Sequence, residues 1–252
     1  MKDKAIIFDI DGTAIDSPEQ RLPSEKLVKA IKKIKDSYFL SAATGRVWSF
    51  AKPVLHDLNL TDPCIISAGT QICDPQSGKI LWQKNIDQNA LKKALKILIE
   101  YPNYKLLYND GTQDDYLYGG YYPKNVTIDG PVYFLEQIFI PNEIAPEIHK
   151  KLLAIPEITC VKAVAQRPGM SDLHIINKSA TKEHAVTELL KTINVTREKT
   201  IGIGDGHNDI HLFNAVHHKV AMANAVSVLK EKADQVIGSV KNEGLATYLQ
   251  SL

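Results

Sequence analysis

The sequence predicts an α/β protein in which a parallel sheet is interrupted by an inserted α+β segment. Near both ends of the 252-residue chain, short apolar runs of strand length alternate with segments of helical periodicity. This alternation is typical of a parallel sheet covered by helices. In the middle of the chain, at roughly 82–176, neighbouring strand-like runs replace it. That change indicates an insertion built on an antiparallel sheet.

The N-terminal part of the chain is predicted to form a strand, a helix and a second strand. The apolar run 5–8 is the first strand, and the run 38–42 is the second. Pro23 and Ser24 signal the start of the helix between them. One face of this helix is apolar at the spacing i, i+3, i+4 and i+7. The residues of that face are Leu27, Ala30, Ile31 and Ile34.

The same alternation returns near the C-terminus. A helix is expected to begin near Asn208 and another to cover about 226–233. Strands are expected at 200–204, 219–222 and 235–237. Together with the N-terminal strands they predict a Rossmann-like parallel sheet core, formed by residues 1–81 and 177–252.

The inserted segment, 82–176, is expected to form a domain of its own. A hairpin closes at 78–82 just before it, and a stretch rich in Tyr and Gly occupies 101–133. Helices are expected at 89–100 and 143–154, and strands at 133–140, 159–164 and 173–176.

Composition excludes several classes of function. The chain has 30 Lys and Arg against 29 Asp and Glu, a net charge of +1, so no electrostatic excess attracts nucleic acid or an anionic membrane. No apolar run approaches the length of a spanning helix. The three cysteines, Cys64, Cys73 and Cys160, lack the spacing of a disulfide framework or a zinc site. A cytoplasmic location is expected.

Two carboxylates follow the first strand. Asp9 and Asp11 stand two residues apart where open α/β sheets bind their ligands, followed by Gly12 and Thr13. Such a place suits a nucleophile and an acid or base partner. Gly12 permits a sharp turn, and Thr13 with the amides that follow it can meet an anion. A plain turn would show the same residues, whereas a calcium loop would need further oxygen ligands and a later Glu, a pattern that Pro18-Glu19 does not supply.

Two further strands end in polar residues. Thr44, Gly45 and Arg46 follow the second strand and are a plausible cradle for phosphate oxygens. Arg46 either reaches the ligand or caps a carboxylate. Asp205 and Asp209 follow the strand at 200–204.

These strand ends predict a metal site. If Asp9, Asp11, Asp205 and Asp209 meet at one edge of the sheet, their charges repel one another. Two carboxylates ~4 Å apart repel by about 4 kcal/mol at an effective dielectric constant of ~20. A hard divalent cation would relieve this repulsion, and oxygen ligands with few protein groups suit Mg²⁺.

The three motifs occur in the order found in the haloacid dehalogenase (HAD) superfamily of phosphohydrolases, which the sequence resembles. They are D-I-D-G-T at 9–13, T-G-R at 44–46 and G-D-G-H-N-D at 204–209. A-M-A-N-A at 221–225 and Ala233-Asp234 are similar to later parts of the same family. The resemblance covers the two ends of the chain.

The resemblance implies roles for individual residues. Asp9 would be the nucleophile and Asp11 the general acid and base. Asp9, the Asp11 main-chain carbonyl and Asp205 would hold Mg²⁺. Asn208 and Asp209 would bind metal waters or support the ligands.

The family also implies a lysine and a set of phosphate contacts. Lys182 is the best match for the lysine, although Glu183 stands where the family usually has Gly, and Lys178 is the alternative. Arg46 is a candidate substrate contact. The expected phosphate-binding residues are Ile10, Gly12, Thr44, Gly45 and Lys182, with Thr44 and Lys182 also counted as catalytic.

The position of the insertion resembles the large α/β cap of the Cof-type subgroup, which would select the substrate. Ser67-Ala68-Gly69-Thr70 is similar to the S-x-G-T of sucrose-phosphatase-like members. The expected function is Mg²⁺-dependent hydrolysis of a small phosphomonoester, preferably a sugar phosphate, through an aspartyl-phosphate. A phosphosugar mutase and a non-catalytic binding module of the same fold are the alternatives. The expected partner is a small phosphorylated metabolite, and the protein would be a monomer or a homodimer.

Overall fold

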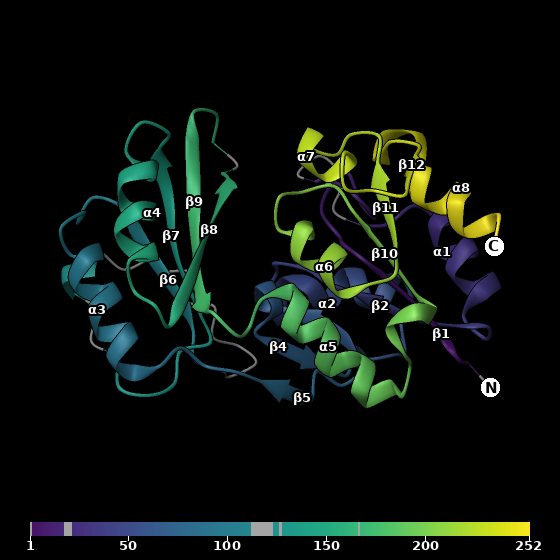
Figure 1. Cartoon of the computed structure of the whole chain (residues 1–252), viewed down its shortest axis with the longest axis horizontal. Coiled ribbons are helices and arrows are strands. Elements are labelled where there is room, and N and C mark those ends of the chain that lie inside the picture. Colours follow the sequence, from purple (N-terminus) through teal and green to yellow (C-terminus); the bar gives the residue numbers. More distant parts are fainter. Residues whose placement is uncertain (1, 18–21, 112–122, 126–127, 166) are drawn as a thin grey trace. The chain divides into compact units, whose positions relative to one another are not determined.

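The computed structural model describes residues 2–17, 22–111, 123–125, 128–165 and 167–252. It divides into two compact units, which are drawn in Figure 1. Unit 1 comprises Met1–Trp82 and Lys182–Leu252, and unit 2 comprises Gln83–Thr181. Much of the Tyr-rich stretch expected at 101–133 lies outside the described residues.

Unit 1 is built on a five-stranded sheet in which every neighbouring pair is parallel. Phe8 at the end of β1 lies opposite Ala42 of β2 on one side and Ile203 of β10 on the other. The carboxyl ends of these three strands therefore share one edge. In sheet order the strands are β12 (Gln235–Ile237), β11 (His218–Met222), β10 (Thr200–Gly204), β1 (Lys4–Phe8) and β2 (Tyr38–Ala42).

Strand β1, which has a neighbouring strand on each side, carries no polar side chain along most of its length. Ala5, Ile6, Ile7 and Phe8 of β1 are completely buried. A strand covered on both faces reads as a continuous apolar run. Each fully buried Ile or Phe stabilises the fold by about 1.5–3 kcal/mol.

Helices pack against this sheet, and two pairs lie side by side in Figure 1. In one pair, α1 packs on α8, and in the other, α5 packs on α6. The Ser24 hydroxyl accepts a hydrogen bond from the Leu27 amide and so caps α1. The helices of unit 1 are α1 (Glu25–Ile34), α2 (Trp48–Asp57), α5 (Lys182–Ile193), α6 (Asp209–Ala215), α7 (Ser227–Lys230) and α8 (Gly244–Gln250).

A small second sheet extends unit 1 beyond β2. Its strands, in order, are β3 (Cys64–Ile66), β4 (Gln71–Cys73) and β5 (Ile80–Gln83). A single parallel bridge between Ala43 and Ile65 links β3 to the end of β2.

Unit 2 has its own sheet and core. In Figure 1 the helices α3 and α4 lie beside the sheet. Ile148 and Leu152 of α4 pack in one apolar cluster with Leu135, Leu173 and Ile175 of the strands. The helices are α3 (Gln88–Leu98) and α4 (Ala145–Leu153). The antiparallel sheet has the order β6 (Lys105–Asn109), β7 (Phe134–Pro141), β9 (Met170–Asn177) and β8 (Ile158–Val164).

The largest differences in length from the sequence expectation are found in α7 and β9. The helix expected near 226–233 is regular only over Ser227–Lys230, because the amides of Lys232 and Ala233 bond three residues back. Strand β9 begins earlier than expected. Its polar residues are hydrogen-bonded, since Ser171 donates to Asn142 and Asp172 accepts from the Phe139 amide at a bulge in β7.

Within the residues that the structure describes, no helix combines the length and apolar character needed to cross a membrane.

Candidate active site

The polar residues after β1 and β10 meet at the shared edge of the sheet. Asp9 directly follows β1, and its amide donates to the carbonyl of Ile203 in β10. Asp205 directly follows β10, and Asp209 is the first residue of α6. One carboxylate oxygen from each of these three aspartates lies within 4.8 Å of the other two. Asp11 is not in this group, although the sequence places it beside Asp9.

Lys182, the first residue of α5, lies against two of these carboxylates. Its Nζ is 2.7 Å from Asp9 Oδ1 and 2.7 Å from Asp209 Oδ1. The Lys182 side chain is 2% exposed, and the Asp209 side chain is fully buried. Lys178, the alternative from the sequence, is exposed and belongs to unit 2. The structure therefore brings Lys182 to the aspartates of unit 1.

The pKa values follow from this arrangement. Burial raises the pKa of Asp9 well above its ordinary value, and Lys182 opposes the rise. Burial, with the nearby Asp209, raises the pKa of Asp205 to about 7. Burial acts to lower the pKa of Lys182, but Asp209 and Asp9 outweigh it, so this pKa rises. One lysine thus leaves three close carboxylates with an excess of negative charge.

The loop after β10 holds Asp209 and Asp205 in place. The amides of Asp205 and Gly206 both donate to Asp209 Oδ2, at 3.0 and 2.9 Å. The Thr13 hydroxyl donates to Asp205 Oδ1 at 2.7 Å. Gly12 has φ +82°, and a Cβ there would overlap the Asp205 carboxylate. Any other residue at position 12 would displace this carboxylate.

Asp11 is paired with an arginine. Arg46 donates from Nε to Asp11 Oδ2 at 2.9 Å and from Nη2 to Asp11 Oδ1 at 2.6 Å. Of the two roles considered for Arg46, the structure shows the contact with a carboxylate. Thr44 is fully buried just after β2, and its hydroxyl accepts a hydrogen bond from the Arg46 amide.

The remaining predicted residues surround this centre. The Gly12 amide donates to the Ile15 carbonyl, so this amide serves the turn. The amides of Thr13, Ala14 and Ile15 close the same turn on the Ile10 carbonyl. Asn208 precedes α6, and its Oδ1 lies 2.6 Å from where a Cβ of Gly206 would be. Gly45 joins Thr44 to Arg46 and has open space where a Cβ would be.

Sequence reasoning missed two supports of the site. Thr13 was expected to meet an anion together with the amides after it, and not to donate to Asp205. Asn224, within A-M-A-N-A, donates to the Gly12 carbonyl at 2.9 Å and accepts from the Val240 amide. Asn224 lies in a motif that is similar to one in the HAD family, and this similarity is the feature of the sequence that could have indicated its role.

The donor set fits a hard divalent cation. Asp9, Asp205 and Asp209 offer carboxylate oxygens that are close together, and Lys182 contacts two of these three side chains. Oxygen ligands of this kind are those that Mg²⁺ and Ca²⁺ prefer.

Comparison with known proteins now identifies the family. A family model of haloacid dehalogenase-like hydrolases matches residues 6–121 and 124–249. The chain belongs to the haloacid dehalogenase-like hydrolases. The resemblance inferred from the three motifs is therefore confirmed, and so is the α/β fold class.

Relatives in this family are phosphatases. The chain is 26% identical to the 5-amino-6-(5-phospho-D-ribitylamino)uracil phosphatase YwtE of Bacillus subtilis, covering 99% of this chain and 98% of YwtE. It is 28% identical to a phosphoglycolate phosphatase of Archaeoglobus fulgidus, covering 100% and 97%. The solved structure of the HAD subclass IIB sugar phosphatase BT4131 has a TM-score of 0.76 at 21% identity, covering 98% of each chain. This haloacid dehalogenase-like hydrolase is a phosphoric monoester hydrolase.

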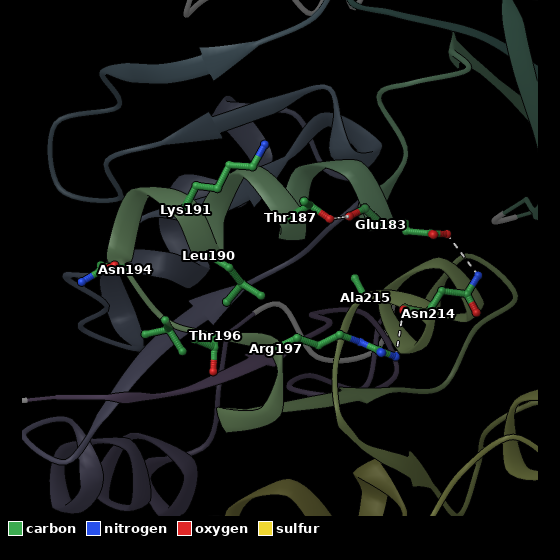
Figure 2. Close-up of a pocket in the computed structure, with 10 residues that line it drawn as sticks. Glu183, Thr187, Leu190, Lys191, Asn194, Thr196, Arg197, Asn214 and Ala215 are labelled. Atoms are coloured by element: carbon green, nitrogen blue, oxygen red, sulfur yellow. Dashed lines mark hydrogen bonds between the residues drawn. The ribbon is translucent and has the colours of Figure 1, made fainter.

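A hollow of about 460 Å³ lies beside α5 and α6 (Figure 2), and none of the aspartates described above is among the residues that line it. Asn214 of α6 donates to Glu183 of α5 at 3.1 Å, and Arg197 donates to the Asn214 carbonyl. Glu183 follows Lys182 in the chain. This surface hydrogen bond therefore joins the start of α5 to α6, which carries Asp209.

The raised pKa of Asp205 predicts how the stability of the metal-free hydrolase depends on pH. A folded-state pKa of about 7 lies above the ordinary 3.8, so folding is favoured by this group at low pH. That contribution is lost as the pH rises through about 7. A bound divalent cation should offset the loss.

We therefore expect Mg²⁺ to raise the Tm more at pH 8 than at pH 5. At about 100 times its Kd, the ion should raise the Tm by roughly 5–10 °C at pH 8. Differential scanning calorimetry with Mg²⁺ and with EDTA measures this shift. In Asp205→Asn the difference between the two pH values should shrink. Equal shifts at pH 5 and pH 8 in the unaltered protein would contradict the prediction.

Proposed function

We propose that this hydrolase is a Mg²⁺-dependent phosphatase that uses Asp9 as its nucleophile. The observation that carries the proposal is the buried contact of Lys182 with both Asp9 and Asp209, beside Asp205. Lys182, on one side of the Asp9 carboxylate, opposes the rise in its pKa that burial causes and so favours the ionised form. An ionised carboxylate at a sheet edge where ligands bind is suited to attack phosphorus.

The proposed reaction has two steps. The Asp9 carboxylate forms a bond to phosphorus while the ester P–O bond breaks, and Asp11 gives its proton to the leaving oxygen. Asp11, now a carboxylate, takes a proton from a water that attacks the aspartyl-phosphate. This releases phosphate and restores Asp9 and the protonated Asp11.

The site must also offset the charge of the transferring phosphoryl group. Lys182, the Thr44 hydroxyl and the amides near Ile10 and Gly45 are the proposed contacts. Asp9, Asp205 and the Asp11 carbonyl would hold Mg²⁺, supported by Asn208 and Asp209. Bound there, Mg²⁺ would supply positive charge to the phosphoryl oxygens.

For the substrate we propose a small phosphorylated metabolite, with a sugar or polyol phosphate preferred. The Ser67–Gly69 turn with Thr70, which resembles that of sucrose-phosphatase-like members, favours this class. The names of YwtE and BT4131 are consistent with it. Unit 2 is proposed as the domain that selects the substrate, and unit 1 as the catalytic core. A cytoplasmic protein, monomeric or homodimeric, fits this role.

A panel of phosphomonoesters tests the proposal. Sugar phosphates, phosphoglycolate, nucleotides and pyridoxal phosphate are incubated with the protein, and phosphate release is measured with Mg²⁺ and with EDTA. We expect release that depends on Mg²⁺ and a sugar or polyol phosphate with the highest kcat/KM. Activity unaffected by EDTA would refute the role of the metal. Faster transfer from Asp9 to an added sugar than to water would favour a mutase.

A further inference from the structure

The ion pair between Arg46 and Asp11 has a geometry that suggests a catalytic purpose. Nε and Nη2 of Arg46 each donate to a different oxygen of Asp11, the parallel arrangement that is strongest for an arginine and a carboxylate. The side chains are 21% and 39% exposed. The edge of the guanidinium that would suit a phosphate is thus directed at Asp11.

Arg46 is itself fixed at two further points. Its Nη1 donates to the Phe50 carbonyl in α2 at 3.2 Å. Its amide donates to the Thr44 hydroxyl at 3.1 Å. The guanidinium is therefore held between α2 and the loop after β1, and it sets the orientation of both Asp11 oxygens.

We propose that Arg46 is a positioning residue for proton transfer by Asp11, rather than a ligand of the substrate. This inference rests on the proposed function, in which Asp11 protonates the leaving oxygen. When that proton leaves, Asp11 becomes the carboxylate that pairs with the guanidinium. Arg46 thus stabilises the form of Asp11 that appears as the P–O bond breaks. An interaction stronger in the transition state than before it accelerates the step.

Two kinds of substrate separate this role from a structural one. An alkyl phosphate leaves as a strongly basic alkoxide and needs the proton of Asp11. p-Nitrophenyl phosphate leaves as a stable anion and hardly needs it. General acid catalysis contributes typically about 10²–10⁴-fold. A variant with impaired proton transfer should therefore lose far more activity on the alkyl ester.

The experiment measures kcat/KM, which reports formation of the phosphoenzyme, for both substrates in Arg46→Gln and Arg46→Lys. We expect Arg46→Gln to lose about 100-fold on the alkyl phosphate and under about 10-fold on p-nitrophenyl phosphate. Arg46→Lys has a single nitrogen in place of the planar fork of the guanidinium. Its loss of activity on the alkyl phosphate should lie between that of Arg46→Gln and that of the unaltered protein. Arg197→Gln is the matched control, because its guanidinium bonds only a surface carbonyl among its described contacts. It should leave both values unchanged.

Asp11→Asn separates failure of this inference from failure of the proposed function. Asp11→Asn should show the same selective loss, and adding Arg46→Gln to it should cost little more. If Asp11→Asn loses both substrates equally, the proposed role of Asp11 is wrong. If Asp11→Asn is selective but folded Arg46→Gln loses both substrates equally, Arg46 acts on structure or binding and the inference fails. Circular dichroism and the Tm verify that each variant is folded.

Discussion

Replacing Asp9 by asparagine is expected to abolish phosphate release. The amide of asparagine is a poor nucleophile, so no aspartyl-phosphate can form. Loss of a catalytic nucleophile in a well-studied hydrolase costs about 10⁶-fold in kcat, and we expect a loss of at least about 10⁴-fold here. Initial rates with the best substrate of the panel, at saturating Mg²⁺, measure this loss.

The fold should survive this substitution. Asparagine keeps an oxygen that accepts from Lys182, the donor that is 2.7 Å from Asp9 Oδ1. Burial raises the pKa of Asp9, so the folded state disfavours its charge, and a neutral side chain should leave the metal-free Tm equal or higher at pH 8. Asp3→Asn is the matched control, since Asp3 pairs with Lys199 at the surface. A folded Asp9→Asn with more than a few per cent of the activity would refute the nucleophile assignment.

The meeting of Asp9 with Asp205 and Asp209 could be predicted because it follows from topology. Parallel strands bring their carboxyl ends to one edge, and the apolar runs that precede these aspartates mark the strand ends. The fold class was predictable from the alternation of strand-length and helical segments, and the family membership from the three motifs and their order. The roles of the individual residues stay predictions.

The partners of individual side chains were not predictable. The sequence left Arg46 with two possible roles, because spacing does not say which of several nearby carboxylates a long side chain reaches. Thr13 and Asn224 also act across the fold, bonding Asp205 and the Gly12 carbonyl from distant positions in the chain. Strand β9 was only partly predicted, since its polar residues are satisfied by contacts with neighbouring segments.

Lys182 is expected to matter for both stability and turnover, because it is the cation that the buried carboxylates contact. Its Nζ bonds Asp9 and Asp209, each at 2.7 Å. Removing one partner of a buried ion pair costs about 3–5 kcal/mol, since the other charge stays buried without compensation. We expect Lys182→Met to lower the free energy of unfolding by that amount at pH 8 without metal, as measured by urea denaturation.

The loss of stability in Lys182→Met should depend on the negative charge of the nearby carboxylates, and removing one of those charges should restore part of the stability. At pH 5 Asp205, whose pKa is raised to about 7, holds a proton in the folded state, and the raised pKa of Asp9 acts in the same direction, so Lys182→Met should cost less there. The double variant Lys182→Met with Asp209→Asn should be more stable at pH 8 than Lys182→Met alone. Lys191→Met, which removes an exposed pair with Glu188, is the control and should cost under about 1 kcal/mol.

Turnover gives the second measurement on the same variant. Without Lys182, the phosphoryl group lacks a fixed positive charge, and kcat should fall about 10²–10³-fold even where Mg²⁺ restores folding. If Lys182→Met were as stable as the unaltered protein at both pH values, the carboxylates would be compensated by some other group. If it were destabilised but kept its full kcat in the presence of Mg²⁺, Lys182 would serve the fold alone. Lys182 serves both the fold and the reaction if Lys182→Met loses stability and kcat together. In that case the double variant should recover the stability but not the kcat.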